Sequence, residues 1–426
     1  MAQFIVEGGY RLDGEYRVSG NKNEALPIVA ATVLAGAPVT LKNVPEIRDV
    51  RALIEILGQL GCIVTEPEPG TVVFDARPMQ AGTIPEDLGR RIRASILLAG
   101  PLLARFGTVV LPPPGGDVIG RRRLDTHFDA FKTMGARVEI GRSYFLETRG
   151  LRGVELFLDE QSVTATENIV MAAVTAEGTT TVMNAALEPH VQGLCRFLNG
   201  LGARIEGIGT NFLTIHGVPA LGGGEYTIGG DYLEAGSIIG LAAVTNSEVT
   251  VQGVDPRDLR VILSTFERLG IRTHLHGADI FVPTNQELVV KADYHGAIPK
   301  IDDAPWPQFP TDLMSIAIVV ATQASGTLLF FEKMYEGRMF FVDTLIGMGA
   351  RIIMCDPHRV VVVGPSELYG TRMESPDIRA GMALLIAGLA ARGTSRIGNV
   401  QQIDRGYERI DQKLRKLGAH IERVEG

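Results

Sequence analysis

Residues 111–127 read LPPPGGDVIGRRRLDTH and place one carboxylate, Asp117, shortly before Arg121, Arg122 and Arg123. The prolines and glycines ahead of the acid are typical of a loop that can move. A salt-bridged surface turn would account for this composition. So would a site at which arginines hold an anion and the acid, once buried by loop closure, delivers a proton to it.

A second carboxylate, Asp312, follows the segment PWPQFP, whose prolines stiffen the backbone and fix the direction of the side chain. If arginines lie nearby, this carboxylate should be ionised and able to accept a proton from a hydroxyl group. The chain has no Walker motif, no GxGxxG after a strand and no HExxH, so kinase, dehydrogenase and zinc-protease activities lack support.

A recurring phrase predicts the elements that would position these residues. It occurs six times, roughly 70 residues apart, and consists of a glycine with β-branched residues shortly after it. The glycines are Gly61, Gly135, Gly202, Gly270, Gly349 and Gly418. Each closes an amphipathic stretch, so we expect it to end a helix in the left-handed conformation and to precede a strand.

Each unit also contains a helix rich in small apolar residues, such as NEALPIVAATVLAG, which we expect to be buried. The fold class predicted is α/β (α+β), with two domains of three helix–strand units each and the apolar helices inside. Glycines cluster near residue 230, where we expect the domain break. Domain I would comprise 1–21 plus 230–426, and domain II would comprise 22–229 with the mobile loop 112–123.

Basic residues recur at the predicted helix starts. Arg48, Arg122, Arg257 and Arg405 occupy equivalent positions ahead of the repeated glycines. An arginine is unfavourable beside the partly positive end of a helix unless an anion lies opposite. A salt bridge is the alternative for Arg48, which has Glu46 and Asp49 nearby, and for Arg257, which has Asp255 and Asp258 nearby. The other two lie in glycine-flanked turns and are the better candidates for anion binding.

The apolar helices open with polar residues where apolar ones would suffice. These residues are Lys22, Asn23, Arg93, Glu167, Asn168, Glu234, Asp312 and Arg379. Helix capping explains Asn168 and Asp312 but neither Lys22 nor Arg93. If these helix starts face a cleft between the domains, the basic ones would form a multivalent anion site together with Arg405.

The composition limits the class of protein. The chain has 426 residues and a net charge of -8, which argues against a general nucleic-acid binder. Its three cysteines form no CxxC pair, so we expect a reducing compartment, no disulfide framework and no zinc cluster. The N-terminus lacks the features of a signal peptide, and the apolar stretches are too short to span a bilayer. We expect a soluble, cytoplasmic protein with no metal, no cofactor and no membrane association.

Several motifs, in this order, resemble those of the UDP-N-acetylglucosamine 1-carboxyvinyltransferase family of enolpyruvyl transferases. They are SGNKNEALP (19–27), RASILLAGP (93–101), PGGDVIGRRRLDTH (114–127), ATENIVMAA, FPTDL, YEGRMFF and IDRGYERI. The resemblance covers the chain from its N-terminus to GAHIERVEG. The motif IDRGYERI helps to distinguish this family from the shikimate-pathway enolpyruvyl transferases, which share the fold. The fold implied is a two-domain inside-out α/β barrel, each domain a threefold repeat.

The activity implied by the resemblance is transfer of the enolpyruvyl group of phosphoenolpyruvate to the 3'-hydroxyl of UDP-N-acetylglucosamine, with release of phosphate. The reaction would proceed by addition–elimination through a tetrahedral intermediate. It would be the first committed step of peptidoglycan synthesis, and so would serve cell wall biogenesis, cell shape, the cell cycle and cell division. The expected partners are these two small molecules, and the expected state is a monomer or a weak homo-oligomer.

The resemblance also implies roles for individual residues. Lys22, Arg122 and Arg405 would hold the phosphate and carboxylate of phosphoenolpyruvate. Asn23 would lie beside them, and Asp312 would take the proton from the attacking hydroxyl. The residues implied to bind the nucleotide sugar are Arg93, Arg122, Arg123, Leu124, Asp125, Thr126, Ser162, Val163, Thr164 and Met334. Secondary anion contacts would be Arg338 and Arg379.

Asp117 occupies the loop position at which most members of the family have cysteine. By resemblance it would protonate the methylene carbon of the donor. Because a carboxylate is a far weaker nucleophile toward epoxides than a thiolate, we expect insensitivity to fosfomycin, which alkylates that cysteine. The other departures, Asn21, Glu24, Glu160 and Tyr232, concern substrate affinity and leave room for a paralogue that acts on a related nucleotide sugar.

Two alternatives stay open at this point. One is transfer of enolpyruvyl to a different acceptor, such as shikimate 3-phosphate. The other is a ring without enzymatic activity, because DNA sliding clamps are also built from six α/β repeats. A clamp needs a basic inner helical face, whereas the helices expected inside this protein are apolar.

Overall fold

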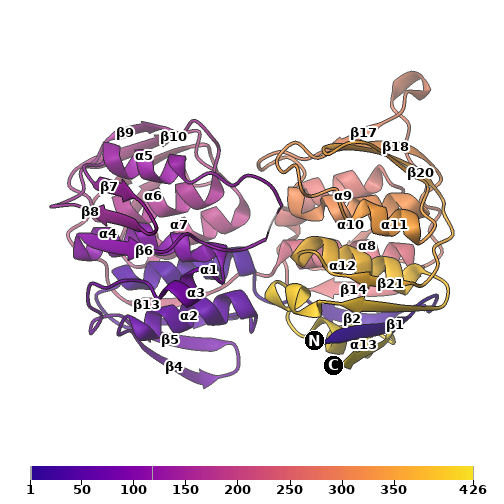
Figure 1. The fold of residues 1–426 in the computed structure, drawn as a ribbon, viewed down its shortest axis with the longest axis horizontal. Helices are drawn as coiled ribbons and strands as arrows, with labels where there is room; N and C mark the ends of the chain where they lie inside the picture. The colour runs from indigo at the N-terminus through magenta and orange to yellow at the C-terminus, as the bar shows by residue number, and fades with distance from the viewer. Residues whose placement is uncertain (1, 118, 426) are drawn as a thin grey trace. The chain divides into compact units, whose positions relative to one another are not determined.

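The chain forms two compact units in the computed structural model, which describes residues 2–117 and 119–425 (Figure 1). Unit 1 comprises Met1–Ser19, Val118–Arg121 and Gly230–Gly426, and unit 2 comprises Gly20–Asp117 and Arg122–Gly229. The break after Gly229 lies in the glycine-rich segment of the sequence. That each unit folds as an independent domain stays a prediction.

Unit 1 contains three four-stranded sheets, with strand orders β21-β22-β1-β23, β15-β16-β14-β2 and β17-β18-β20-β19. Its strands are β1 (Gln3–Glu7), β2 (Asp13–Arg17), β14 (Glu248–Gln252), β15 (His274–His276), β16 (Asp279–Val282), β17 (Lys300–Asp302), β18 (Gly326–Phe331), β19 (Ile352–Asp356), β20 (Arg359–Gly364), β21 (Arg372–Glu374), β22 (Thr394–Gly398) and β23 (His420–Val424). Its helices are α8 (Tyr232–Val244), α9 (Arg260–Glu267), α10 (Met314–Gln323), α11 (Val342–Gly347), α12 (Ile378–Ala390) and α13 (Ile410–Lys416), with 3₁₀ turns η3 (Pro256–Leu259), η4 (Tyr294–Gly296), η5 (Thr311–Leu313) and η6 (Val400–Arg405).

Unit 2 contains two four-stranded sheets, β11-β12-β10-β9 and β13-β3-β5-β4, and the three-stranded sheet β6-β8-β7. Its strands are β3 (Val39–Lys42), β4 (Ile63–Glu68), β5 (Thr71–Asp75), β6 (Thr108–Leu111), β7 (Arg137–Ile140), β8 (Tyr144–Glu147), β9 (Glu155–Phe157), β10 (Thr179–Met183), β11 (Arg204–Glu206), β12 (Phe212–His216) and β13 (Gly224–Thr227). Its helices are α1 (Lys22–Ala31), α2 (Arg48–Gln59), α3 (Glu86–Gly89), α4 (Ala99–Phe106), α5 (Asp125–Thr133), α6 (Val163–Ala173) and α7 (Pro189–Gly200), with 3₁₀ turns η1 (Thr32–Leu34) and η2 (Arg93–Leu98).

The N-terminal strands complete sheets of unit 1. β1 pairs antiparallel with both β22 and β23, and β2 pairs in parallel with β14. The first strands of the chain are therefore built into sheets whose other strands come from the C-terminal half.

The six repeated glycines end helices as their spacing predicts. They have φ values between 88° and 110° at Gly61, Gly135, Gly202, Gly270, Gly349 and Gly418. This left-handed conformation is strained for residues with a Cβ, so the glycine sets the point at which each amphipathic helix stops. A strand follows in most of the repeats, which confirms the α/β fold class.

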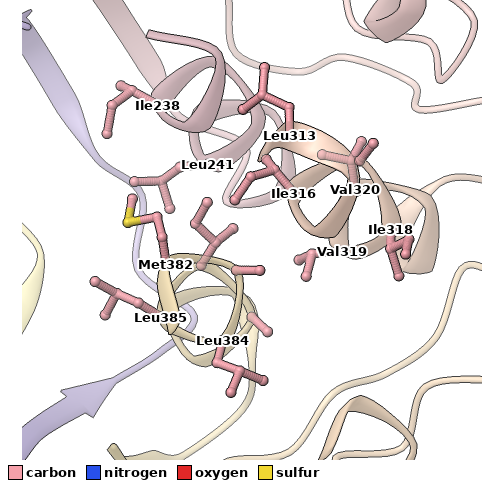
Figure 2. Close-up of a cluster of buried hydrophobic side chains, with 14 of the residues drawn as sticks. Ile238, Leu241, Leu313, Ile316, Ile318, Val319, Val320, Met382, Leu384 and Leu385 are labelled. Atoms are coloured by element: carbon pink, nitrogen blue, oxygen red, sulfur yellow. The ribbon is translucent and has the colours of Figure 1, made fainter. Parts of the chain in front are cut away.

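The apolar helices lie inside their units, as predicted. In unit 1, α10 packs against both α8 and α12, and the three helices lie side by side with strands above and below in Figure 1. Figure 2 shows the side chains of Leu241, Ile316 and Met382 meeting between them, all at most 1% exposed. In unit 2, α4 packs against α6 in the same way. Within the described residues, no helix is long and apolar enough to cross a membrane.

Residues 119–121 of loop 112–123 group with unit 1, and the expected bounds of the two domains stay a prediction. The N–H of Gly337 donates to the carbonyl of Ile119 at 2.8 Å, and the N–H of Arg121 donates to Glu336 Oε1 at 3.2 Å. A Cβ at position 337 would lie 2.7 Å from the Ile119 carbonyl carbon, so glycine permits this approach. Arg121 and Glu336 are 215 positions apart, which is why local composition could not predict the contact.

Replacing Gly100 with alanine is expected to destabilise unit 2 by about 1–3 kcal/mol, because α4 and α6 would have to separate. A Cβ at Gly100 would lie 2.4 Å from the backbone oxygen of Asn168. Gly58→Ala in α2 is the matched control, since a Cβ there meets nothing within 4 Å. That variant should gain about 0.5–1 kcal/mol from higher helix propensity. Urea midpoints check both, and equal midpoints for the two variants would contradict the packing argument.

Candidate active site

Lys22 opens helix α1, as predicted, and is held by an acid from α2. The side chain of Asn21 caps α1 by accepting hydrogen bonds from the N–H groups of Asn23 and Glu24. Lys22 Nζ lies 2.8 Å from Asp49 Oδ2, and the side chains are 9% and 6% exposed. A carboxylate in this position offsets the unfavourable placement of an ammonium group at a helix N-terminus. Asp49 therefore forms an ion pair with Lys22, and the salt-bridge interpretation of Arg48 stays a prediction.

Arg93 opens η2, as predicted, and its guanidinium group binds the backbone at the C-terminal end of loop 112–123. Arg93 Nη2 donates to the carbonyls of Arg122 at 3.0 Å and Arg123 at 3.3 Å. A Cβ at Gly116 would lie 2.9 Å from Arg93 Cβ and 3.6 Å from Arg122 Nη1. Arg122 and Arg93 therefore both approach the backbone immediately before Asp117, which is half-buried.

The arginine at 123 is committed to surface ion pairs. Arg123 Nε donates to Asp125 Oδ2 at 2.9 Å and Nη2 donates to Asp159 Oδ2 at 3.0 Å. The hydroxyl of Thr126 donates to the other oxygen of Asp159 at 3.0 Å. Hydrogen bonds to Asp125 and Asp159 raise the pKa of Arg123. These contacts fix the segment between the loop and α5.

Of the arginines predicted at or near helix starts, Arg122 and Arg405 do not open a helix. Arg122 lies in the loop before α5, and Arg405 is the last residue of η6 rather than the first of a helix. Arg257 lies within η3 and pairs with Asp255, so its salt-bridge interpretation is confirmed.

The residues Ser162, Val163 and Thr164 form the start of α6, where Ser162 is the N-cap. Glu167 and Asn168 lie in the middle of this helix and are buried, so the prediction that they open it is wrong. Asn168 is not the N-cap of α6, and its side chain bonds across to η2, α4 and α5.

In unit 1, Asp312 is held between two arginines from distant parts of the chain. Arg338 Nη2 donates to Asp312 Oδ1, and Arg379 Nε donates to Oδ2 at 3.0 Å. The Asp312 side chain is 21% exposed, whereas those of Arg338 and Arg379 are 9% and 5% exposed. Two guanidinium groups favour the ionised carboxylate. The capping interpretation of Asp312 is wrong in its position: Pro310 is the N-cap of η5, and the Asp312 side chain makes ion pairs with Arg338 and Arg379.

Both arginines are stabilised in their charged form. Burial lowers the pKa of Arg379, but Asp312, Tyr407 and Asp231 outweigh it and raise the pKa overall. Arg379 Nη1 also donates to the hydroxyl of Tyr407 at 3.3 Å. Burial lowers the pKa of Arg338 as well. The Asp312 carboxylate is the largest of the effects that raise it, and the pKa is raised overall.

The segment that carries Met334 and Arg338 is anchored by a buried carboxyl pair. Glu332 Oε1 accepts hydrogen bonds from the N–H groups of Met334 at 3.1 Å and Tyr335 at 3.0 Å. Burial and the neighbouring carboxyl of Asp303 raise the pKa of Glu332 to about 9. A raised pKa favours the protonated form, so we expect Glu332 to keep its proton beside the carboxyl group of Asp303.

Replacing Glu332 with glutamine is expected to remove a pH dependence of stability. The folded chain keeps the Glu332 proton up to about pH 9, whereas the ordinary pKa is 4.5. Between these values unfolding releases a proton, so stability is lost as pH rises, by up to about 1.4 kcal/mol per pH unit. Urea unfolding of the wild type and Glu332→Gln at about pH 6 and about pH 8 measures this slope. The exposed Glu287→Gln is the control and should keep the wild-type slope. An unchanged slope in Glu332→Gln would refute the raised pKa of Glu332.

Arg405 is held by a hydrogen bond within its own turn and by the ion pair between the preceding residue, Asp404, and Arg423. Arg405 Nη1 donates to Gln402 Oε1 at 2.9 Å. Arg423 binds both oxygens of Asp404, at 2.9 and 2.7 Å, and also reaches Asp411 at 3.2 Å. Arg423 therefore ties the turn that carries Arg405 to strand β23.

The structure thus gathers the predicted residues into groups within each unit. Unit 1 brings Asp312, Arg338 and Arg379 into direct contact, and unit 2 joins Arg93 to the arginine run. The residues that support these side chains were not predicted as site residues; they are Asp49, His127, Glu332, Asp303 and Arg423. His127 is the last residue of the motif PGGDVIGRRRLDTH, but the sequence does not indicate that its side chain contacts Thr164 and Asn168.

Three departures from the family pattern have structural roles. Asn21 caps α1. Glu24 accepts hydrogen bonds from the Tyr226 hydroxyl at 2.7 Å and from the N–H of Gly229 at 3.0 Å. The ring of Tyr232 packs against that of Trp306, with centroids 5.8 Å apart. The structure gives no account of Glu160, which is exposed.

The chain is similar to known proteins over nearly its whole length. Residues 6–414 match the family model described as EPSP synthase (3-phosphoshikimate 1-carboxyvinyltransferase). Over 422 residues the chain is 54% identical to the UDP-N-acetylglucosamine 1-carboxyvinyltransferase of Treponema denticola, covering 99% of both proteins. It is 56% identical over 422 residues to the protein of the same name from Bradyrhizobium diazoefficiens, covering 99% of this chain and 98% of that protein.

Solved structures show the same fold. The enolpyruvyl transferase NikO from Streptomyces tendae matches with a TM-score of 0.89 at 25% identity, covering 100% of this chain and 99% of that one. EPSP synthase from Acinetobacter baumannii matches with a TM-score of 0.76 at 19% identity, with all of both chains covered, and this likeness concerns the fold alone.

Proposed function

The chain belongs to the EPSP synthase family of enolpyruvyl transferases, and we propose that it transfers the enolpyruvyl group of phosphoenolpyruvate to the 3'-hydroxyl of UDP-N-acetylglucosamine. The observation that carries the choice of acceptor is the identity of 54–56% over nearly the whole chain to proteins named for that acceptor. The enzyme would serve peptidoglycan synthesis in the cytoplasm.

The reaction proposed is an addition followed by an elimination. The 3'-hydroxyl oxygen bonds to C2 of phosphoenolpyruvate while its proton leaves to a base and C3 gains a proton. The tetrahedral intermediate then loses a proton from C3, and the bond between C2 and the phosphate oxygen breaks. Phosphate and the enolpyruvyl ether are released, so no oxidant or reductant is consumed.

Asp312 is proposed as the base that receives the hydroxyl proton. Its position between Arg338 and Arg379 supports this role, because two guanidinium groups favour the ionised form of a carboxylate that is partly exposed and fixed in direction. The same arginines can stabilise negative charge that develops nearby.

Asp117 is proposed as the acid that protonates C3 of the donor, and later takes a proton back. It is half-buried, and the backbone just before it lies against Arg93 and Arg122. Lys22, Arg122 and Arg405 are proposed to bind the phosphate and carboxylate of the donor, with Asn23 beside them. For the nucleotide sugar, the proposed contacts are Arg93, Arg122 to Thr126, Ser162 to Thr164 and Met334.

Release of phosphate from phosphoenolpyruvate tests this assignment when the acceptor is varied. With purified protein, release is expected only in the presence of UDP-N-acetylglucosamine. Release with shikimate 3-phosphate, or with a different nucleotide sugar but not with UDP-N-acetylglucosamine, would identify the alternative acceptor instead. No release with any acceptor would refute enolpyruvyl transfer.

A further inference from the structure

His127 is a fully buried histidine of α5 whose tautomer is set by Asn168 of α6. Asn168 Oδ1 accepts a hydrogen bond from the N–H of Gly100 at 2.8 Å, and Nδ2 donates to the carbonyl of Ile96 at 2.9 Å. Because a backbone N–H can only donate and a carbonyl can only accept, these two bonds fix the orientation of the amide.

The second amide proton of Asn168 is therefore directed at the imidazole. Asn168 Nδ2 lies 3.0 Å from His127 Nδ1, which must accept the hydrogen bond with its lone pair. Burial, together with the positive charge of Arg93, lowers the pKa of His127 to about 3 and keeps the ring neutral. A neutral ring with an unprotonated Nδ1 carries its proton on Nε2.

The proton on Nε2 points to Thr164. His127 Nε2 lies 3.2 Å from Thr164 Oγ1, so the imidazole donates and the hydroxyl oxygen accepts. The hydroxyl still has its own proton to donate, and among the described residues no protein acceptor receives it. Thr164 is half-buried in the first turn of α6, so a ligand can reach it.

We propose that His127 is a positioning residue that orients the Thr164 hydroxyl to donate a hydrogen bond to a diphosphate oxygen of the bound nucleotide sugar. An anionic oxygen is the acceptor that this position favours, because the N-terminus of α6 and the nearby guanidinium of Arg93 both attract negative charge. Thr164 then contributes to the affinity for the nucleotide sugar through its side chain. The proposal rests on the proposed function.

Substitution of the hydroxyl is the first test. Thr164→Val keeps the side-chain shape and removes the donor, and should raise the KM for UDP-N-acetylglucosamine about tenfold or more. The KM for phosphoenolpyruvate should change by less than about twofold. Thr164→Ser keeps the hydroxyl and should recover most of the loss. Thr133→Val is the matched control, because that hydroxyl bonds to the carbonyl of Asp129 within α5.

The second test addresses the positioning role. His127→Gln retains a donor and an acceptor and should show a smaller rise in the same KM than His127→Leu. In a Thr164→Val background, His127→Leu should add little, because both changes remove one interaction. If His127→Leu does not fold, the ¹⁵N chemical shifts of His127 in the wild type decide: they should show a protonated Nε2 and an unprotonated Nδ1 from about pH 5 to about pH 8.

The outcomes separate the two proposals. Absence of wild-type turnover with UDP-N-acetylglucosamine would overturn the proposed function. Normal wild-type turnover with an unchanged KM in Thr164→Val would overturn the role of Thr164 alone. A proton on His127 Nδ1, or a ring that titrates in this range, would overturn the positioning role.

Discussion

Asp117→Asn is expected to lower kcat by about 10²–10⁴-fold while the KM for phosphoenolpyruvate changes little, because an amide cannot deliver a proton to the donor carbon. Asparagine preserves the size of the side chain, so the binding groups around the loop should stay in place. Steady-state kinetics with saturating acceptor measures the effect. The control is Asp87→Asn, which removes an exposed acid paired with Arg91 in the same unit. Full activity in Asp117→Asn would exclude Asp117 from the proton path.

The same position governs the response to fosfomycin. The wild type should keep its activity after preincubation with the epoxide, since a carboxylate is a poor nucleophile. Asp117→Cys should remain active and lose activity progressively during preincubation, because a thiolate attacks the epoxide. Time-dependent inactivation of the wild type would contradict this account, and so would a Cys variant that is active and resistant.

Asp312→Asn is expected to lower kcat by about 10²–10⁴-fold, since the attacking hydroxyl loses its base. The substitution also leaves Arg338 and Arg379 facing a neutral amide, so unfolding by urea should be measured alongside. Asp255→Asn is the matched control, because it removes a carboxylate paired with an arginine at an exposed site of unit 1. If kcat falls no further in Asp312→Asn than in the control, Asp312 is not the base.

Features with a local signature could be predicted from the sequence. The repeated glycines end helices because the left-handed conformation is a property of one residue and its immediate neighbours. The apolar helices are buried because their small residues suit close packing on several sides. The positions of Lys22 and Arg93 at helix starts follow from the same local patterns.

Features that depend on distant partners could not be predicted. The fragment TENIV suggests a capped helix start at Asn168, but the helix begins earlier, with Ser162 as its N-cap. The Asn168 side chain instead donates a hydrogen bond to a histidine 41 positions away. Asp312 looked like a cap, but it pairs with arginines 26 and 67 positions away. The contact between the loop tip and Glu336 belongs to the same class. A one-dimensional pattern carries the period of a helix but not the identity of the chain segment packed against it.

Solvent deuterium provides the most direct test of enolpyruvyl transfer by addition and elimination. The purified chain is incubated with phosphoenolpyruvate and UDP-N-acetylglucosamine in heavy water, and the product is examined by mass spectrometry and proton NMR. We expect one phosphate per molecule of enolpyruvyl ether on the 3'-oxygen, with deuterium in its vinyl group, because C3 becomes a methyl group in the intermediate before it loses a proton. An ether product without deuterium would contradict the addition–elimination route, and the absence of the ether would contradict the proposed function itself.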